Sequence, residues 1–169
     1  YVGYFKKVYG QRLQKVVIDG GFTCPNRDGS ISTGGCTYCD NSAFHPGYST
    51  PNIPILTQID EGIKFHKVRY RNAERFLAYF QPYSNTYAPL ERLKVLYEEA
   101  LSHPQVAGIV IGTRPDCVDE QKLDYLAKLA ENHIVIVEYG IESCYDRTLE
   151  RINRGHSFEQ ARRALEMTA

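Results

Sequence analysis

The run Val106-Ala107-Gly108-Ile109-Val110-Ile111 is the clearest structural signal in the sequence, and Gly112-Thr113-Arg114-Pro115-Asp116 follows it directly. An unbroken apolar run of this length predicts a strand buried on both faces, because a strand with one face in water alternates apolar and polar residues. Shorter β-branched or aromatic runs occur at three other places, Lys15 to Ile18, Phe76 to Phe80 and Ile134 to Val137. We therefore predict four buried strands.

Segments with helical periodicity separate and follow these strands. In each, apolar residues recur at the three- and four-residue spacing of one helix face. The predicted helices run from Pro54 to about Arg71, from Pro89 to Leu101 and from Asp119 to Asn132, and a last one follows His156. Strands that alternate with helices in this way predict an α/β fold with about four βα units around a parallel sheet.

Polar segments follow all four predicted strands. In parallel α/β sheets the functional groups gather beyond the C-terminal ends of the strands, because the loops converge there. The first strand leads into a long loop, residues 20–54, which contains three cysteines. A loop of more than about 15 residues in a compact domain is usually functional or disordered. We expect it to form one site with the segments Gln81 to Thr86, Gly112 to Asp116 and Glu138 to Ser143.

The composition limits the class of protein. The chain has 169 residues, 43% hydrophobic and 24% charged, which is typical of one folded domain with a substantial core. Twenty Lys and Arg balance 20 Asp and Glu, and this balance excludes a histone-like polycation. No run approaches the ~20 apolar residues of a membrane span, and the chain does not open on the apolar block of a signal peptide. We expect a cytoplasmic protein that does not enter a membrane.

Three of the five cysteines, Cys24, Cys36 and Cys39, fall within sixteen residues, which favours a metal site or reactive thiols over a disulfide framework. The Cys36-Thr37-Tyr38-Cys39 spacing lets both sulfurs reach one metal, and the neighbouring glycines let peptide N–H groups face thiolate or sulfide charge. Ordinary [4Fe–4S] clusters take four thiolates. A cluster on these three cysteines would leave one iron open to an external ligand.

Two other chemistries fit the same cysteines. A structural zinc ion would be coordinated by the three cysteines and a fourth group such as His45. A thioredoxin-like redox pair would use Cys36 and Cys39, although that motif is expected at a helix start. The zinc interpretation leads to our alternative function, a zinc-stabilised nucleic-acid-binding module without catalysis.

Several separate motifs, in order, resemble the radical S-adenosylmethionine (SAM) superfamily. They are Cys24-Pro25-Asn26-Arg27-Asp28-Gly29, Gly34-Gly35-Cys36-Thr37-Tyr38-Cys39, Gly112 to Asp116, Glu138 to Ser143, and Asn153-Arg154-Gly155-His156. Within the superfamily the sequence is most similar to the bacterial YtqA/YhcC group, itself similar to the catalytic subunit of elongator. Eleven residues separate the first two cysteines, a wider gap than the familiar pattern has and one that these branches share. No Gly-Gly-Glu follows the second strand, and Gln81-Pro82-Tyr83-Ser84 stands in its place.

The resemblance implies a partial TIM-like (βα) barrel that holds a [4Fe–4S] cluster on Cys24, Cys36 and Cys39, with SAM on the fourth iron. It implies that the reduced cluster cleaves SAM to a 5′-deoxyadenosyl radical, which abstracts a hydrogen atom from the substrate. The residues implied in cofactor binding are Tyr38, Gln81, Tyr83, Ser84, Thr113, Arg114, Asp116, Glu138 and Ser143. Tyr38 would pack near adenine, and Glu138 and Ser143 would bond ribose hydroxyls.

Ordinary structural roles also explain some of these residues. Arg114 and Asp116 could pair with each other, or the aspartate could cap the following helix. Glu138 is expected directly after an apolar strand, where a carboxylate needs partners or water in a pocket. Cys117 and Cys144 stand alone, and we interpret them as small semi-buried side chains rather than ligands. Arg154 and His156 could contact an anion, and a turn leading into a helix explains them equally well.

The resemblance implies RNA chemistry, on the side chain of a tRNA wobble uridine, and an electron donor such as flavodoxin or ferredoxin. Residues 64–76 interleave basic and aromatic side chains, which fits either a phosphate backbone or a solvated helix face. The chain ends inside a helical pattern without a stop signal, so we expect residues 1–169 to be a truncated radical SAM core. Residues 1–14 would be an N-terminal extension and residues 20–54 the cluster-binding loop. An exposed sheet edge predicts a homo-oligomer of the fragment.

Overall fold

The computed structural model describes residues 2–10, 12–69 and 73–169, and one four-stranded sheet organises them. The strands are β1 (Gln14–Ile18), β2 (Phe76–Phe80), β3 (Val106–Thr113) and β4 (Ile134–Tyr139). They lie in the order β1-β2-β3-β4, and each neighbouring pair is parallel. Four parallel strands in one open sheet confirm the predicted α/β fold, part of a TIM-like barrel. Strands β3 and β4 each run two residues further than predicted, so Thr113 and Glu138 belong to strands.

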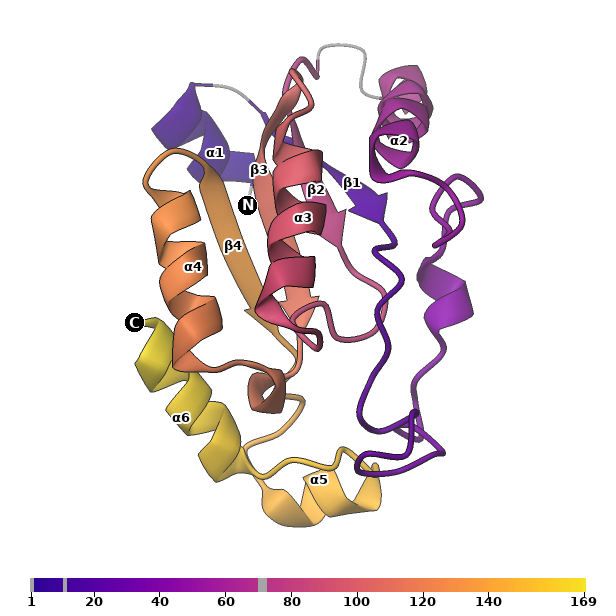
Figure 1. The fold of residues 1–169 in the computed structure, drawn as a ribbon, viewed down its shortest axis with the longest axis vertical. Coiled ribbons are helices and arrows are strands. Elements are labelled where there is room, and N and C mark those ends of the chain that lie inside the picture. Colours follow the sequence, from indigo (N-terminus) through magenta and orange to yellow (C-terminus); the bar gives the residue numbers. More distant parts are fainter. Residues whose placement is uncertain (1, 11, 70–72) are drawn as a thin grey trace.

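In the described part of the chain, six helices accompany the strands, and three of them, α2 to α4, cover one face of the sheet. They are α1 (Val2–Tyr9), α2 (Ile55–Arg69), α3 (Leu90–Leu101), α4 (Glu120–Ala130), α5 (Asp146–Arg151) and α6 (Phe158–Thr168), with short 3-10 helices η1 (Asn41–Phe44) and η2 (Pro115–Cys117). Figure 1 shows α2, α3 and α4 in front of the sheet and α5 and α6 beyond its strand ends. The four predicted helices are confirmed, although the end expected at Arg71 lies outside the described residues. Helices α1 and α5 are not predicted by the sequence pattern.

The main core lies between the sheet and helices α2 to α4. Alternate strand residues point into it and are completely buried, namely Val16, Ile18, Phe76, Ala78, Phe80, Ile109 and Ile111. Helix α2 approaches β1 closely, because a Cβ atom on Gly62 would lie 2.2 Å from Val16 Cγ1. Each fully buried aliphatic or aromatic side chain stabilises the fold by about 1.5–3 kcal/mol, so this face of the sheet supplies much of the stability.

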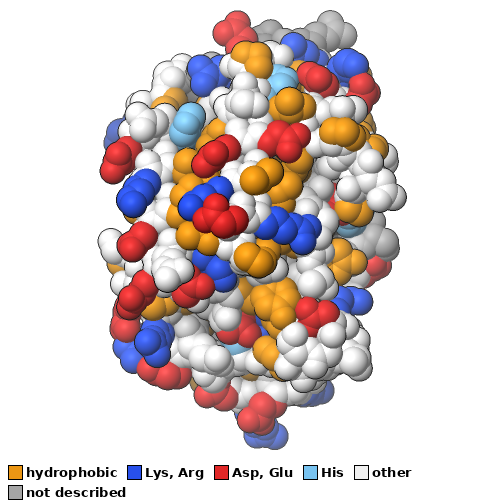
Figure 2. Space-filling view, in the orientation of Figure 1, with side chains coloured by type: hydrophobic (Ala, Val, Ile, Leu, Met, Phe, Trp, Pro, Cys, Tyr) orange, Lys and Arg blue, Asp and Glu red, His pale blue; other side chains and the backbone are white. Residues whose placement is uncertain are grey.

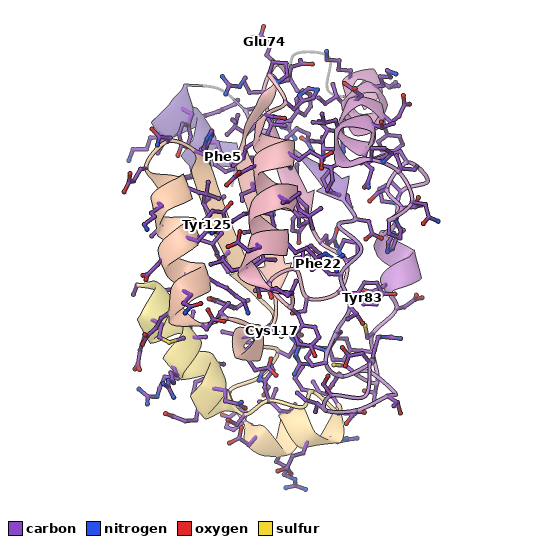
Figure 3. The ribbon with its side chains drawn as sticks, viewed as in Figure 1. Phe5, Phe22, Glu74, Tyr83, Cys117 and Tyr125 are labelled. Carbon is purple, nitrogen blue, oxygen red and sulfur yellow. The ribbon has the colours of Figure 1, made fainter. Side chains whose placement is uncertain are left out.

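The opposite face of the sheet is packed differently at its two ends. Where the strands begin, Phe5 of α1 and Leu13 pack against Leu77 and Val110 in a smaller apolar cluster, and Figure 3 labels Phe5 at that end. Nearer the strand ends, Lys15 Nζ lies 2.5 Å from Glu138 Oε1. A flat sheet would hold β1 and β4 about 14 Å apart. The sheet therefore curves toward this face, as the wall of a barrel does.

No helix in the described ranges has both the length and the apolar character needed to cross a lipid bilayer.

Candidate cofactor-binding site

A cavity of about 310 Å³ lies at the C-terminal ends of the strands, on the face that α2 to α4 leave uncovered. All three clustered cysteines line it, together with residues from the ends of β2, β3 and β4. Figure 3 labels Tyr83, which belongs to this lining, beyond the strand ends and beside the cysteine-bearing loop. The structure thus brings the loops that follow the four strands to one place.

The residues implied in cofactor binding divide into two groups. Six line the cavity: Tyr38, Gln81, Tyr83, Thr113, Arg114 and Glu138. The other three, Ser84, Asp116 and Ser143, are not part of its lining. The Ser84 hydroxyl bonds to Thr113 Oγ1 at 3.0 Å, Asp116 accepts from Arg114, and the Ser143 hydroxyl oxygen accepts from the Tyr145 N–H at 3.1 Å. Ser84 and Asp116 therefore support residues of the wall.

Several other residues of the wall were not predicted as cofactor contacts. They include Arg27, Asn41, Tyr79 and Glu142, while Arg154 was expected only as one alternative, a contact to an anion. Signals for some of them were present, since Arg27 and Arg154 lie inside motifs that resemble the superfamily. Tyr79 is one residue from the completely buried Phe80, so strand alternation places it on the uncovered face.

Backbone turns shape the cysteine-bearing loop. The Arg27 N–H donates to the Cys24 carbonyl at 2.8 Å, and the Cys39 N–H donates to the Cys36 carbonyl at 3.0 Å. Gly35 has a φ of 74°. A side chain there would be strained, and its Cβ would lie 2.9 Å from Arg27 Nε. The glycine therefore allows the arginine to approach the loop backbone.

The turn after α5 holds the cysteine-bearing loop in place through hydrogen bonds. The Thr37 N–H donates to the Ile152 carbonyl at 3.0 Å, and Asn153 Nδ2 donates to the Gly35 carbonyl at 2.8 Å. Asn26 Nδ2 donates to the Arg154 carbonyl at 3.0 Å and is buried. Segments more than 100 residues apart in the chain thus fix the position of Cys36.

An arginine lies beside each of the three cysteines. Arg114 Nη1 lies 4.0 Å from Cys24 Sγ, and Arg154 Nη1 lies 3.5 Å from Cys36 Sγ. Arg27 Nη2 donates to the Cys39 carbonyl at 2.9 Å, and hydrogen bonding and charge interaction with Cys39 raise the pKa of Arg27. N–H donors near sulfur tune iron–sulfur clusters.

Two buried donors in the wall have no hydrogen-bond partner among the described residues. They are Arg27 Nε and Asn41 Nδ2. A buried polar group without a partner costs about 1–3 kcal/mol. A ligand with oxygen or nitrogen acceptors would satisfy both groups, which suits the cavity to a polar cofactor.

The Lys15 and Glu138 side chains form an ion pair across the uncovered face. Each is 27% exposed, and Lys15 Nζ also lies 4.2 Å above the centre of the Tyr79 ring. Glu138, expected to need a partner at a strand end, finds it on the first strand. The carboxylate remains part of the cavity wall.

Arg114 and Asp116 pair with each other, which was one of the two alternatives left open by the sequence. Arg114 donates to the carboxylate through Nε at 2.8 Å and through Nη2 at 2.7 Å. The following helix α4 is instead capped by Asp119, whose side chain accepts from the Lys122 N–H. The buried arginine is thereby held against the cavity with its charge balanced.

Tyr38 and the two remaining cysteines differ in exposure. Tyr38 is 50% exposed, and its partial burial raises the pKa of its hydroxyl. Cys117, labelled beneath the strand ends in Figure 3, is buried, and burial raises the pKa of its thiol to about 11. Cys144 is exposed rather than semi-buried. Neither of these cysteines lines the cavity.

The donor set fits an iron–sulfur cluster. Three cysteines share one cavity, Arg114 lies near Cys24 Sγ, and Arg154 and Asn26 lie near Cys36 Sγ. Within the described ranges, no three His, Cys, Asp or Glu side chains are grouped so that they could hold a metal ion. His45, the suggested fourth zinc ligand, lies with Nδ1 3.0 Å from the Ser49 carbonyl. The fit of a cluster therefore rests on the donor types and their surroundings.

A curved parallel α/β sheet with three cysteines at its C-terminal edge defines a class of proteins that hold a cofactor beyond the strand ends. Residues 26–169 match the radical SAM superfamily, and the chain belongs to that superfamily.

Curated relatives agree with this assignment. The chain is 40% identical over 151 residues to Protein YhcC of Escherichia coli (strain K12) and 38% identical over 160 residues to Uncharacterized protein YtqA of Bacillus subtilis (strain 168). It is 36% identical over 165 residues to Uncharacterized protein MJ0486 of Methanocaldococcus jannaschii. These alignments cover 89%, 92% and 96% of this chain but 47%, 48% and 49% of the relatives. The chain thus spans about half the length of the curated relatives it matches. The predicted similarity to the YtqA/YhcC group is confirmed, and the likeness to elongator stays a prediction.

Proposed function

We propose that this protein is a radical SAM enzyme that holds a [4Fe–4S] cluster on Cys24, Cys36 and Cys39 and binds SAM in the adjoining cavity. One observation supports this more than any other. The three cysteines of the superfamily-like motif line one cavity at the strand ends, and each has an arginine beside it. When bound, the cluster and SAM supply one-electron cleavage of the sulfonium and hydrogen-atom abstraction.

The protein's own residues bind the cofactor, orient it and enclose it. Arg27 Nε and Asn41 Nδ2 offer donors that no described residue uses, and Glu138 offers a carboxylate for hydroxyl groups of the nucleoside. Tyr38 presents a half-exposed ring for the adenine base, and Gln81, Tyr83 and Thr113 complete the polar wall. Ser84 and Asp116 act through Thr113 and Arg114, the wall residues that they hold. Ser143 stays a proposed contact of the ribose.

We propose tRNA, at the wobble uridine, as the substrate, with flavodoxin or ferredoxin as electron donor. The support is the resemblance of the motifs to the elongator-like branch. Helix α2 adds an exposed surface with Phe65 at 61% and Val68 at 80% exposure, although Lys64 there pairs with Glu61 at 2.6 Å. Tyr70 and Arg71 of the basic and aromatic stretch lie outside the described residues. Figure 2 shows basic and acidic side chains interspersed over the helix-covered face, so this face does not favour RNA.

Anaerobic reconstitution tests the proposed function. The full-length protein, supplied with iron and sulfide, should turn brown, hold about four irons, and release 5′-deoxyadenosine from SAM when reduced. Cys36→Ala should abolish both the colour and SAM cleavage, while Cys144→Ala, at an exposed cysteine outside the cavity, should change neither. A colourless protein with stoichiometric zinc after anaerobic purification would favour the zinc-stabilised nucleic-acid-binding module instead.

A further inference from the structure

Two buried arginines lie beside cysteine sulfurs, and their charges are balanced differently. Arg114, 2% exposed, forms a two-pronged ion pair with Asp116. Arg154, 8% exposed, donates to neutral groups: the Gly140 carbonyl, His156 Nε2 at 3.1 Å and Cys36 Sγ at 3.5 Å. Within the described residues no ion pair joins Arg154 to a carboxylate.

A buried cation among neutral partners is energetically costly. The effective penalty for burying an ion is several kcal/mol unless an opposite charge compensates it. The nearest compensating group that Arg154 contacts is Cys36 Sγ, which becomes negative as a thiolate ligand. Glu142 Oε1 lies on the same side of Gly140 as the guanidinium, since a Cβ atom there would lie 3.1 Å from Glu142 Oε1 and 2.7 Å from Arg154 Nη2. Glu142 is exposed, so solvent screens its charge, and within the described residues it forms no ion pair with Arg154. The positive charge of Arg154 is thus compensated when Cys36 bears a negative charge.

The guanidinium of Arg154 is held in place from several directions. His156 is 6% exposed and accepts from Arg154 Nε, while Gly140 leaves room for Nη2, since a Cβ atom there would lie 2.7 Å away. The backbone of Arg154 is fixed as well, because its carbonyl accepts from Arg114 Nη1 at 2.8 Å and from Asn26 Nδ2 at 3.0 Å. The side chain therefore has little freedom to move away from Cys36.

We propose that Arg154 raises the reduction potential of the cluster by fixing a positive charge beside Cys36, and that His156 and Gly140 are positioning residues for its guanidinium. This inference rests on the proposed function, because it requires a cluster on the three cysteines. Reduction adds negative charge to the cluster, and a nearby cation stabilises the reduced form in a poorly solvated site. Arg114 contributes less, because Asp116 offsets its charge at close range.

Redox titration of the reconstituted full-length protein, followed by electron paramagnetic resonance, tests the inference without requiring turnover. Arg154→Gln should reduce the ratio of reduced to oxidised cluster at a fixed poise about tenfold, a lowering of about 59 mV for a one-electron couple. Arg154→Lys keeps the charge and should stay within about threefold of the wild-type ratio. The matched control is Arg151→Gln, which removes the same charge from an exposed position on α5 and should leave the ratio unchanged.

The outcomes separate the two proposals. Wild-type protein that takes up no cluster would overturn the proposed function and this inference with it. A wild-type cluster whose potential Arg154→Gln leaves unchanged would overturn the inference alone, even if that variant holds less iron, because a structural role alters content rather than potential. If Arg154→Gln holds no cluster, Arg154→Lys decides: a wild-type potential supports the role of charge, and a tenfold change in the ratio contradicts it.

Discussion

Val16 and Val17 are neighbours in β1 but belong to two different surroundings. Val16 is completely buried against helix α2, whereas Val17 lies half-buried on the opposite face of the sheet. The same contrast extends across the sheet. The helix-covered face is formed by apolar side chains at close packing, and the uncovered face bears Lys15, Tyr79 and Glu138 beside the cavity.

This difference shows how one set of strands can serve two purposes. Because side chains alternate along a strand, a strand can stabilise the fold through one face and present polar groups through the other. A substitution on the helix-covered face should therefore change the free energy of unfolding most. A substitution on the uncovered face should change it less and should affect ligand binding more.

Phe80→Ala should have the largest effect on stability. Phe80 is completely buried, and its ring meets the Tyr97 ring edge-on with centroids 5.0 Å apart. We expect a loss of about 3–5 kcal/mol in the free energy of unfolding, measured by urea denaturation. Tyr79→Ala, on the adjacent residue of the other face, is the control and should cost about 1–2 kcal/mol. Equal losses would mean that the two faces do not differ in this way.

A double-mutant cycle at Gly62 and Val16 tests the packing of the covered face at atomic scale. Gly62→Ala should cost about 1–3 kcal/mol, because its Cβ would lie 2.2 Å from Val16 Cγ1 and 2.9 Å from Tyr48 Cε2. Val16→Ala removes the Cγ1 atom, so the second alanine should cost much less in that background. Urea denaturation of the four proteins gives the coupling. Additive losses would contradict close packing between α2 and β1, and Val17→Ala should not rescue Gly62→Ala.

Strong local patterns made much of the fold predictable. Four strands and four helices follow from the apolar runs and their periodicity, and their parallel order brings the loops together. Helix α5 escaped prediction because its six residues include a single buried apolar side chain, Leu149. Helix α1 is short as well, and what anchors it is the packing of Phe5 on Leu77 and Val110, which are distant in sequence.

The site was predictable in its chemistry and less so in its contacts. The cysteines and six other residues of the wall were predicted from motifs, but a motif does not say which arginine meets which sulfur. Arg154 is 118 residues from Cys36, and Lys15 is 123 residues from Glu138. Such pairs depend on the curvature of the sheet and on the turn at Asn153, whose φ of 52° no local pattern signalled.

Lys15→Met should have the smallest effect on stability, although it breaks an ion pair that spans the sheet. Both side chains are 27% exposed, so solvent screens the attraction, and we expect a loss of less than about 1 kcal/mol. In a double-mutant cycle with Glu138→Gln the coupling should be about 0.2–1 kcal/mol by urea denaturation. Lys64→Met is the matched control, because Lys64 pairs with Glu61 on the exposed surface of α2.

The two lysines should differ in their effect on ligand binding, even though neither contributes much to stability. Lys15 holds the Glu138 carboxylate of the cavity wall, whereas Lys64 and Glu61 are absent from that wall. If the proposed function is correct, Lys15→Met should weaken SAM binding to the reconstituted full-length protein several-fold by titration calorimetry, and Lys64→Met should not. A coupling well above 1 kcal/mol together with unchanged SAM affinity would instead make the Lys15–Glu138 pair a brace of the fold. The uncovered face would then stabilise the fold, as the helix-covered face does.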